Sequence, residues 1–154
     1  MTVGAVDQRL AAAGFELPGP AAVVGSYVPA VRAGDLVFTS GQLPVRGGEL
    51  LAVGGVPSEV QPEDAAACAA QCALNALAAA STVCDLDTVV RVVKLVGYVA
   101  SAPDFGGQPG VINGASEVMR IAFGEAGTHA REAVGVAALP LGAPVEVSLV
   151  LEVR

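Results

Sequence analysis

The run Val145–Val153 constrains the fold of this chain more than any other segment. Apolar side chains occupy every second position from Val145, while Glu146, Ser148 and Glu152 stand between them. This period of two predicts a β-strand with one face in a core. A carboxylate inside so apolar a strand is either an outward-facing residue or a functional group. The residues alone leave both interpretations of Glu146 open.

Two long segments predict helices. Residues 62–83 begin with Pro62, which suits a first helical position, and Glu63 and Asp64 complement the positive end of the helix dipole. Residues 111–126 repeat apolar side chains at helical spacing, and Gly127 ends the pattern.

The other patterned segments predict strands and loops. The turn at Gly34 predicts a hairpin, since glycine tolerates positive φ. Arg91 and Lys94 do not share a face of a regular strand, so we expect a strand end, an edge or a bulge near one of them. Glycine and proline breaks predict that residues 46–60 form a loop with at most one short strand near Glu49–Ala52. The expected strands are residues 21–31, 36–40, 88–100, 133–139 and 145–153.

The order of these elements is strand pair, helix, strand, helix, strand pair. Helices between strands favour crossover connections, with two helices packed on one face of a mixed sheet in an α+β fold. A length of 154 residues favours a single domain over residues 1–154. Residues 1–20 add an N-terminal helix and loop. No third layer remains for the other apolar face of the sheet, so we expect self-association to cover it.

The composition argues against several classes of function. A formal net charge of -7, with only eight Lys and Arg residues, does not suit a nucleic-acid partner. Neither a membrane span nor a signal peptide is evident, so we expect a cytoplasmic protein with reduced thiols. Cys68 and Cys72 have one helical turn between them but no nearby ligand pair, since the one histidine is His129. We interpret both cysteines as buried small residues and expect no metal site.

A series of motifs runs through most of the chain. It comprises YVPAVRAGDLVFTSGQLP from Tyr27 to Pro44, the strand VVRVVKLVGYVAS, Asn113, the pair Ala130-Arg131, the pair Leu139-Pro140 and the run Val145-Glu146-Val147. In order and spacing the series resembles the RidA family of YjgF-like proteins, also labelled L-PSP endoribonuclease. The resemblance covers roughly residues 21–153. It implies a chorismate mutase-like fold of the bacillus type, a homotrimer, and pockets that lie between subunits.

The resemblance also implies an activity. Characterised members hydrolyse enamines or imines, made from amino acids by pyridoxal phosphate enzymes, to 2-oxo acids and ammonia without a cofactor. Arg131 matches the residue that binds the substrate carboxylate, Glu146 matches the one that positions the attacking water, and Tyr27 matches a residue of the pocket wall. We therefore expect a small carboxylate substrate, with Arg131 and Glu146 as the catalytic residues.

Further contacts complete the expected substrate-binding set. Gly41 and Gln42 can offer backbone or amide groups, while Asn113, near a helix start, either contacts the ligand or caps the helix. Ala133 stands where the family frequently carries a cysteine, and His129 replaces a common proline. We interpret His129 as a loop residue at the pocket mouth and not as a general base, because a charge switch needs a coupled partner.

Physical chemistry supports the role of Arg131 and limits its geometry. A guanidinium group binds a carboxylate through two parallel hydrogen bonds, although a solvated arginine at a strand end is the simpler alternative. If residues 133–139 and 145–153 pair directly as a hairpin, Arg131 lies about 16 Å from Glu146 along the strand direction. Either the two strands are not neighbours in that register, or the pocket takes groups from two subunits.

Three functions follow from these observations. The first is hydrolytic deamination of enamines or imines by a trimer. The second is a non-catalytic trimer that binds a small carboxylate or metabolite. The third is the endoribonuclease activity of the older family label, which the acidic charge disfavours.

Overall fold

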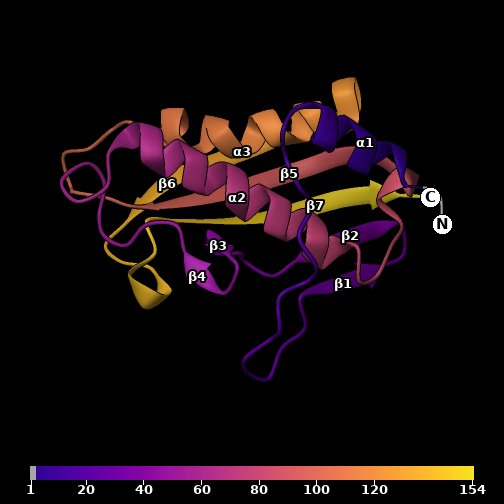
Figure 1. The fold of residues 1–154 in the computed structure, drawn as a ribbon, viewed down its shortest axis with the longest axis horizontal. Coiled ribbons are helices and arrows are strands. Elements are labelled where there is room, and N and C mark those ends of the chain that lie inside the picture. The colour runs from indigo at the N-terminus through magenta and orange to yellow at the C-terminus, as the bar shows by residue number, and fades with distance from the viewer. Residues whose placement is uncertain (1–2) are drawn as a thin grey trace.

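The computed structural model describes residues 3–154 and shows a mixed sheet covered by helices on one face (Figure 1). Short 3₁₀ turns follow or precede several elements at Leu86–Thr88, Gly124–Gly127 and Pro140–Gly142. The helices are α1 (Ala5–Ala12), α2 (Pro62–Ala80) and α3 (Gln108–Phe123). The strands are β1 (Ala30–Ala33), β2 (Leu36–Thr39), β3 (Val45–Arg46), β4 (Glu49–Leu50), β5 (Val89–Ala100), β6 (Ala130–Val136) and β7 (Val145–Val153).

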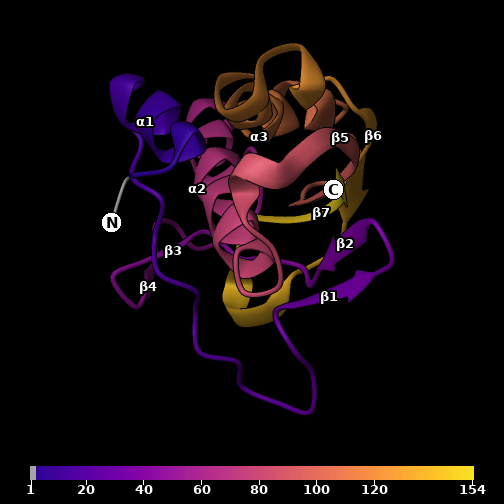
Figure 2. The same cartoon turned by 90° about the vertical axis from the view of Figure 1, so that its right-hand side faces the viewer.

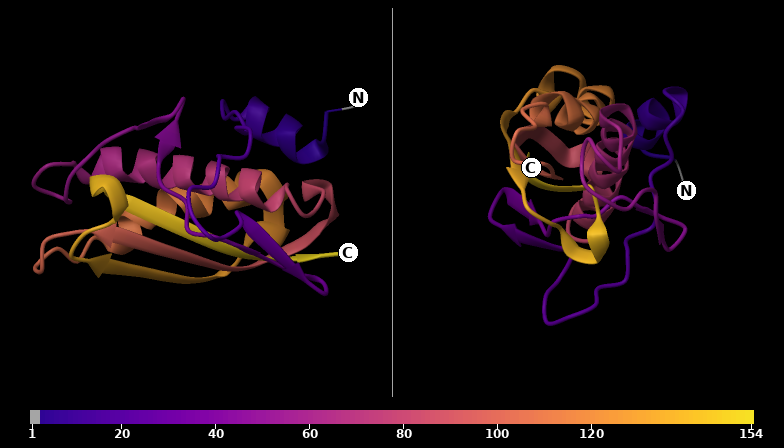
Figure 3. Two further views of the ribbon diagram at one scale, coloured as in Figure 1. Left: turned by 90° about the horizontal axis from the view of Figure 1, so that it is seen from below. Right: turned by 90° about the vertical axis from the view of Figure 1, so that its left-hand side faces the viewer.

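The main sheet has the strand order β1-β2-β7-β5-β6. Only β5 and β6 run parallel, because α3 carries the chain back between them, and the other neighbours are antiparallel. Both α2 and α3 lie on the same face of this sheet, as Figures 1 and 3 show. The expected α+β architecture, with a mixed sheet and two long helices on one face, is therefore confirmed.

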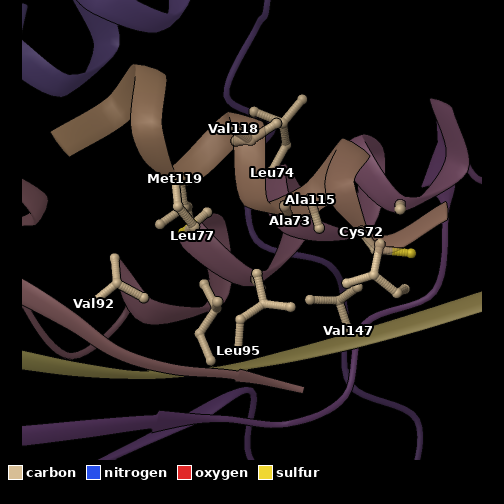
Figure 4. Close-up of a cluster of buried hydrophobic side chains, with 14 of the residues drawn as sticks. Cys72, Ala73, Leu74, Leu77, Val92, Leu95, Ala115, Val118, Met119 and Val147 are labelled. Atoms are coloured by element: carbon tan, nitrogen blue, oxygen red, sulfur yellow. The ribbon is translucent and has the colours of Figure 1, made fainter. Parts of the chain in front are cut away.

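The core lies between these two helices and the sheet. In β7 the residues from Val145 onward alternate between buried and partly exposed, as the sequence period predicts. Residues 71–80 of α2 are all buried, since this helix lies beside α3 and against the sheet. Figure 4 shows side chains of α2 and α3 facing Leu95 and Val147 of the sheet. The two cysteines Cys68 and Cys72 are buried in this core, which confirms their interpretation as small packing residues.

The expected pairing of the last two strands is wrong. Strand β5 lies between β6 and β7 and pairs with both of them. The β6–β7 connection is therefore an arch across the sheet, and its 3₁₀ turn holds Leu141 at φ 61°. A parallel crossover through α3 places β6 beside β5, which leaves β6 as the edge strand.

Three local predictions are corrected in the first part of the chain. Residues 21–29 are not a strand, and β1 contains only four residues. This segment carries the chain from α1 in the helix layer to the far edge of the sheet, looping outward on the way, so no strand lies beside it to pair with (Figure 2). Residues 46–60 contain one strand and part of another, because β3 and β4 form their own small hairpin. Helix α2 ends at Ala80, three residues earlier than expected.

The expected irregularity near Arg91 and Lys94 is confirmed. The register of β5 against β7 shifts between Val89 and Arg91, and again between Val92 and Lys94. These shifts bring both cations to the sheet face that the helices leave uncovered, where Arg91 pairs with Glu152 and Lys94 with Glu132. The bulged strand thus gives its outer face ion pairs without placing a charge in the core.

The outer face of the sheet has no covering layer within residues 3–154. Beside the ion pairs it carries exposed apolar side chains on three strands, namely Val31, Leu36, Phe38 and Val134. Val31 and Phe38 are cross-strand neighbours, and an exposed apolar patch of this kind marks an interaction face in many proteins. Within the same residues, no helix has the unbroken apolar length that a bilayer crossing requires.

Helix α1 packs on the body of the protein through the buried Val6 and Leu10, and one distant carboxylate caps its first turn. Asp87 accepts hydrogen bonds from the amides of Ala5 and Val6, at 2.8 and 2.9 Å, so a residue distant in sequence caps this helix. The amides of Val6 and Ala5 lower the pKa of Asp87. The folded chain therefore binds fewer protons here, and the stabilisation is present above pH 3.8 and is lost as the pH falls through the lowered pKa.

We expect Asp87→Asn to loosen α1, because the two backbone N–H groups bond to different oxygens of Asp87 and the amide nitrogen that replaces one of these oxygens cannot accept. Loss of a cap costs about 1 kcal/mol. Hydrogen exchange should accelerate in residues 5–12 at pH 7, and the difference from the wild type should shrink as Asp87 becomes protonated. Asp7→Asn is the control, since it removes a charge from the same helix without touching this cap. Equal protection of α1 in both variants would contradict the proposed tether.

Candidate functional site

Arg131 lies on the edge strand β6 and points toward the helix layer. It pairs with Leu95 of β5, whose side chain is in the core, so Arg131 shares the helix-covered face. Its Nη1 atom donates to Asn113 Oδ1 at 2.7 Å and to Ser116 Oγ at 3.2 Å. Both acceptors are on α3, one turn apart. The chain crosses from β5 through α3 to β6, and this path places Arg131 beside α3. Its two hydrogen bonds to α3 then set the direction of the guanidinium group.

His129 and Ser116 form a hydrogen-bonded pair next to Arg131. Nδ1 of His129 lies 2.6 Å from the carbonyl oxygen of Gly127, and Nε2 lies 2.9 Å from Ser116 Oγ. A carbonyl oxygen only accepts, so Nδ1 donates to Gly127, and in the neutral ring Nε2 then accepts from the serine hydroxyl. The sequence indicated no partner for His129. The structure shows that Ser116 is its hydrogen-bond partner.

These residues line an open groove of about 480 Å³, here termed the Arg131 groove. Its one carboxylate, Glu117, forms an ion pair with Arg120. Within residues 3–154, Arg131 forms no salt bridge. A cation oriented by neutral acceptors is suited to bind an anion. The residues of the groove are Asn113, Ser116, Glu117, Arg120, Gly127, Thr128, His129 and Arg131.

A second group of expected site residues lies elsewhere. Tyr27, Gly41 and Gln42 line a cavity of about 520 Å³ between residues 18–29, the β3–β4 hairpin and α2. Mostly apolar side chains surround this cavity, and Tyr27 itself is exposed. Gln42 also bridges to Val147 through backbone hydrogen bonds in both directions. The Tyr27 cavity and the Arg131 groove share no lining residue.

Glu146 lies beside Gly41 on the outer face of the sheet. A Cβ atom on Gly41 would stand 2.0 Å from Glu146 Oε1, so the glycine leaves room for the carboxylate. Burial raises the pKa of Glu146 above its ordinary value of 4.5. A half-buried carboxyl group of this kind is suited to hold or orient a water molecule.

Arg131 and Glu146 of one protomer do not meet. Arg131 pairs with Leu95, whereas Glu146 pairs with Tyr98, so the two are three residues and two strands apart. That offset corresponds to about 14 Å between their Cα atoms. Their side chains also lie on opposite faces of the sheet. The sequence left two options, namely strands that are not neighbours or a pocket that takes groups from two subunits. Strands β6 and β7 are not neighbours, so the first option is correct. One ligand cannot touch both groups within a protomer.

The raised pKa of Glu146 predicts a pH-dependent stability. The folded chain holds its proton more tightly than the unfolded chain, so this group opposes folding increasingly as the pH rises through its raised pKa. We expect Glu146→Gln to stabilise the protein at pH 7 by less than about 1 kcal/mol, since solvent screens a half-exposed carboxyl group. Urea unfolding at pH 4 and pH 7 measures the effect, and the two proteins should converge at the lower pH. A larger gain at pH 4 than at pH 7 would contradict the assignment.

The other expected contacts have different outcomes. Asn113 does contact Arg131, as an acceptor from α3. Ala133 faces Gly97 of β5, packs against the core, and is not one of the eight residues of the Arg131 groove. Within residues 3–154, no cluster of three His, Cys, Asp or Glu side chains could hold a metal ion.

Four polar residues of the groove were not expected from the sequence, namely Thr128 and three residues of α3. Ser116, Glu117 and Arg120 follow Asn113 at intervals of three, four and seven residues along α3. This spacing places them on one face of a helix. The stripe of polar residues could have identified them, but only the tertiary structure shows that the stripe faces Arg131.

Comparison with known proteins places the chain in a family. The model of the YjgF/chorismate mutase-like, putative endoribonuclease family matches residues 7–153. Protein TCP17 of Trypanosoma cruzi is 41% identical over 153 residues, and the match covers 98% of this chain and 96% of that protein.

Two solved structures show the same fold over nearly the whole chain. The protein Atu1372 of Agrobacterium tumefaciens, of unknown function, is 42% identical with a TM-score of 0.88, covering 97% of this chain and 93% of that one. A putative endoribonuclease of Shewanella oneidensis MR-1 is 32% identical with a TM-score of 0.92, covering 97% of this chain and all of that one (100%). The expected resemblance is therefore confirmed: this chain belongs to the YjgF/chorismate mutase-like, putative endoribonuclease family.

Proposed function

We propose that this protein hydrolyses enamines or imines derived from 2-amino acids to 2-oxo acids and ammonia. The observation that carries the proposal is the Arg131 groove. There a guanidinium group is held in place by Asn113 and Ser116 and forms no salt bridge within residues 3–154. Nη1 makes both of these hydrogen bonds, so Nη2 and Nε can bind the two oxygens of a carboxylate.

The substrate class follows from this arrangement. A 2-imino acid presents a carboxylate next to an electrophilic carbon, so anchoring the first positions the second. One relative gives independent support for an amino acid-like ligand. TdcF of E. coli has been solved with bound serine, and it is 29% identical to this chain with a TM-score of 0.57, covering 88% of this chain and 93% of that one.

The active form in this proposal is a homotrimer with a site between subunits. The outer face of the sheet is the surface that self-association would cover, since it exposes apolar side chains on β1, β2 and β6. Glu146 lies on this face, so it can serve the carboxylate held at Arg131 only from a neighbouring copy. Tyr27, exposed beside the sheet edge, is the expected pocket wall in the same arrangement. Light scattering on the purified protein measures the subunit number, and a monomer would contradict the trimer.

The experiment follows product directly. A pyridoxal phosphate-dependent dehydratase acting on serine generates 2-aminoacrylate, and lactate dehydrogenase reports the pyruvate released. Wild-type protein should accelerate pyruvate release over the spontaneous rate in buffer, in proportion to its concentration. Rates equal to buffer at every concentration would overturn the proposal.

Two other functions are separated by related measurements. Calorimetry with 2-oxo acids that shows binding, together with no turnover, would assign the protein to a non-catalytic ligand-binding role. The word endoribonuclease in the family name suggests RNA cleavage, but a net charge of -7 opposes binding to a phosphate backbone. RNA binding that weakens with salt would favour that activity.

A further inference from the structure

Two acceptors on α3 hold one end of the Arg131 guanidinium group. Its Nη1 atom donates to Asn113 Oδ1 at 2.7 Å and to Ser116 Oγ at 3.2 Å. Both hydrogens of Nη1 lie in the plane of the group, so two acceptors at this nitrogen set the direction of that plane. The edge formed by Nη2 and Nε stays free for a carboxylate, and Ser116 lies on the other side of the group.

The two acceptors differ in chemistry. The amide oxygen of Asn113 only accepts, whereas the hydroxyl of Ser116 is both a donor and an acceptor. Ser116 therefore supports Arg131 only while its own proton points elsewhere, because a proton turned toward Nη1 would place two donors face to face. His129 provides that other direction, since Nε2 lies 2.9 Å from Ser116 Oγ and accepts in the neutral ring.

The backbone in turn orients His129. Its Nδ1 atom lies 2.6 Å from the carbonyl oxygen of Gly127, which only accepts, so Nδ1 carries a proton. Gly127 is buried, and a Cβ atom there would stand 2.2 Å from the carbonyl oxygen of Met119 in α3. This close packing fixes the turn after α3. An ordered series of hydrogen bonds thus runs from the turn through His129 and Ser116 to Arg131.

We infer that His129 is a positioning residue for the anion site at Arg131. It acts through Ser116: by accepting the serine proton it turns the lone pairs of Ser116 toward Nη1, which holds the guanidinium group in one plane. In this role neither His129 nor Ser116 contacts the ligand. The inference rests on the proposed function for the ligand, a carboxylate of a 2-imino or 2-oxo acid, and deepens it by naming what keeps the anion site in shape.

The charges of the groove explain why such positioning matters. The carboxylate of Glu117 is bonded to Arg120, and Arg131 forms no salt bridge within residues 3–154. Neutral acceptors must therefore hold the guanidinium group, and they leave its full positive charge to the ligand. A guanidinium group that is already held loses less conformational freedom when it binds a carboxylate.

Packing alone is the competing explanation for the contact between Ser116 and His129. Two substitutions remove one acceptor each without a large change of shape. Ser116→Ala introduces the better helix former into α3, so the helix should stay folded. His129→Phe keeps an aromatic ring and removes the nitrogen that accepts from Ser116. Packing alone predicts that neither substitution changes the affinity of Arg131 for a carboxylate.

Calorimetry with pyruvate tests the inference without turnover. Ser116→Ala and His129→Phe should each weaken binding about tenfold, since each removes support from a hydrogen bond to a charged group. The combined variant should bind within about twofold of Ser116→Ala, because His129 acts only through Ser116. Ser116→Thr and His129→Gln keep an acceptor and should bind more tightly than Ser116→Ala and His129→Phe. Unchanged affinity in both single variants, or losses that multiply in the combined one, would overturn the inference.

The enamine assay separates positioning from catalysis. In Ser116→Ala and His129→Phe, KM for 2-aminoacrylate should rise about tenfold while kcat changes less than about twofold, because the carboxylate is bound in the ground state and the transition state alike. A fall in kcat with unchanged KM would contradict a positioning role. Glu125→Gln is the control, since Glu125 is exposed on the turn before His129 and does not line the groove.

Nuclear magnetic resonance reports the two orientations directly. Because His129 is the one histidine in the chain, long-range ¹H–¹⁵N spectra of the wild type show its tautomer without ambiguity. A neutral ring with its proton on Nε2 would overturn the inference, since that ring cannot accept from Ser116. The ¹⁵N relaxation of Arg131 Nε, identified by its loss in Arg131→Met, should show a more mobile guanidinium group in His129→Phe than in the wild type. Equal mobility would also overturn it.

The outcomes separate this inference from the proposed function. Pyruvate binding without turnover overturns the proposed function, and the affinities of the variants then decide the role of His129. Turnover with unchanged KM in Ser116→Ala and His129→Phe overturns only the positioning role. A wild type that neither binds pyruvate nor accelerates its release overturns both.

Discussion

Replacing Arg131 with methionine is expected to lower kcat/KM for 2-aminoacrylate by about 100- to 1000-fold. The variant loses two charge-assisted hydrogen bonds to the substrate carboxylate, each worth about 1.5–3 kcal/mol. Much of the loss should appear in KM, since the carboxylate is bound in the ground state and in the transition state alike. Progress curves of pyruvate release over a range of enamine concentrations measure both constants.

Two controls make the Arg131 experiment specific. Arg131→Lys keeps the charge but not the planar fork, so its kcat/KM should fall between those of wild type and Arg131→Met. An imine that lacks a carboxylate should be hydrolysed at the same low rate by wild type and Arg131→Met. A large loss with the neutral imine as well would show that Arg131 maintains the groove and does not bind the carboxylate.

Gly114→Ala is expected to lower the free energy of unfolding by about 3 kcal/mol or more. A Cβ atom at this position of α3 would stand 2.0 Å from the carbonyl oxygen of Ala66 in α2, and that oxygen belongs to a helix backbone that cannot move alone. The two helices would have to separate, which costs more than the usual overpacking penalty of about 1–3 kcal/mol. Urea unfolding followed by circular dichroism measures the change.

Gly110→Ala provides the matched control on the same helix. No atom lies within 4 Å of a Cβ at this position, so the substitution gains the helix propensity of alanine without a clash. It should stabilise the protein by about 0.5–1 kcal/mol. Equal stability of the Gly114→Ala and Gly110→Ala proteins would show that α2 and α3 do not cross as closely as described.

Several parts of the fold were predictable because local chemistry decides them. The alternation in Val145–Val153 and the apolar spacing of both long helices identified the layers of the core. Arg91 and Lys94 required an irregular strand, and the bulges of β5 supply it. The segment 21–29 was wrongly predicted as a strand, since a strand needs a partner and this segment has none beside it.

The candidate site was predictable only in part. Arg131 and Asn113 were both named from the sequence and do contact each other. His129 was interpreted as an isolated loop residue, because its partner Ser116 lies thirteen positions earlier on a helix. Glu146 and Arg131 were expected to converge on a cleft between subunits, and this stays a prediction, since within one protomer they lie on opposite faces of the sheet.

By itself the sequence determined the α+β class, the burial of Cys68 and Cys72, and the family. Periodicity, turn chemistry and motif order are local properties, so they can be read without coordinates. Only the tertiary structure decided that β5 separates β6 from β7 and that the polar stripe of α3 faces Arg131. The physical reason is that the path of the chain through α3 decides which strands are neighbours and which side chains meet Arg131. Residue spacing within one segment does not encode that path.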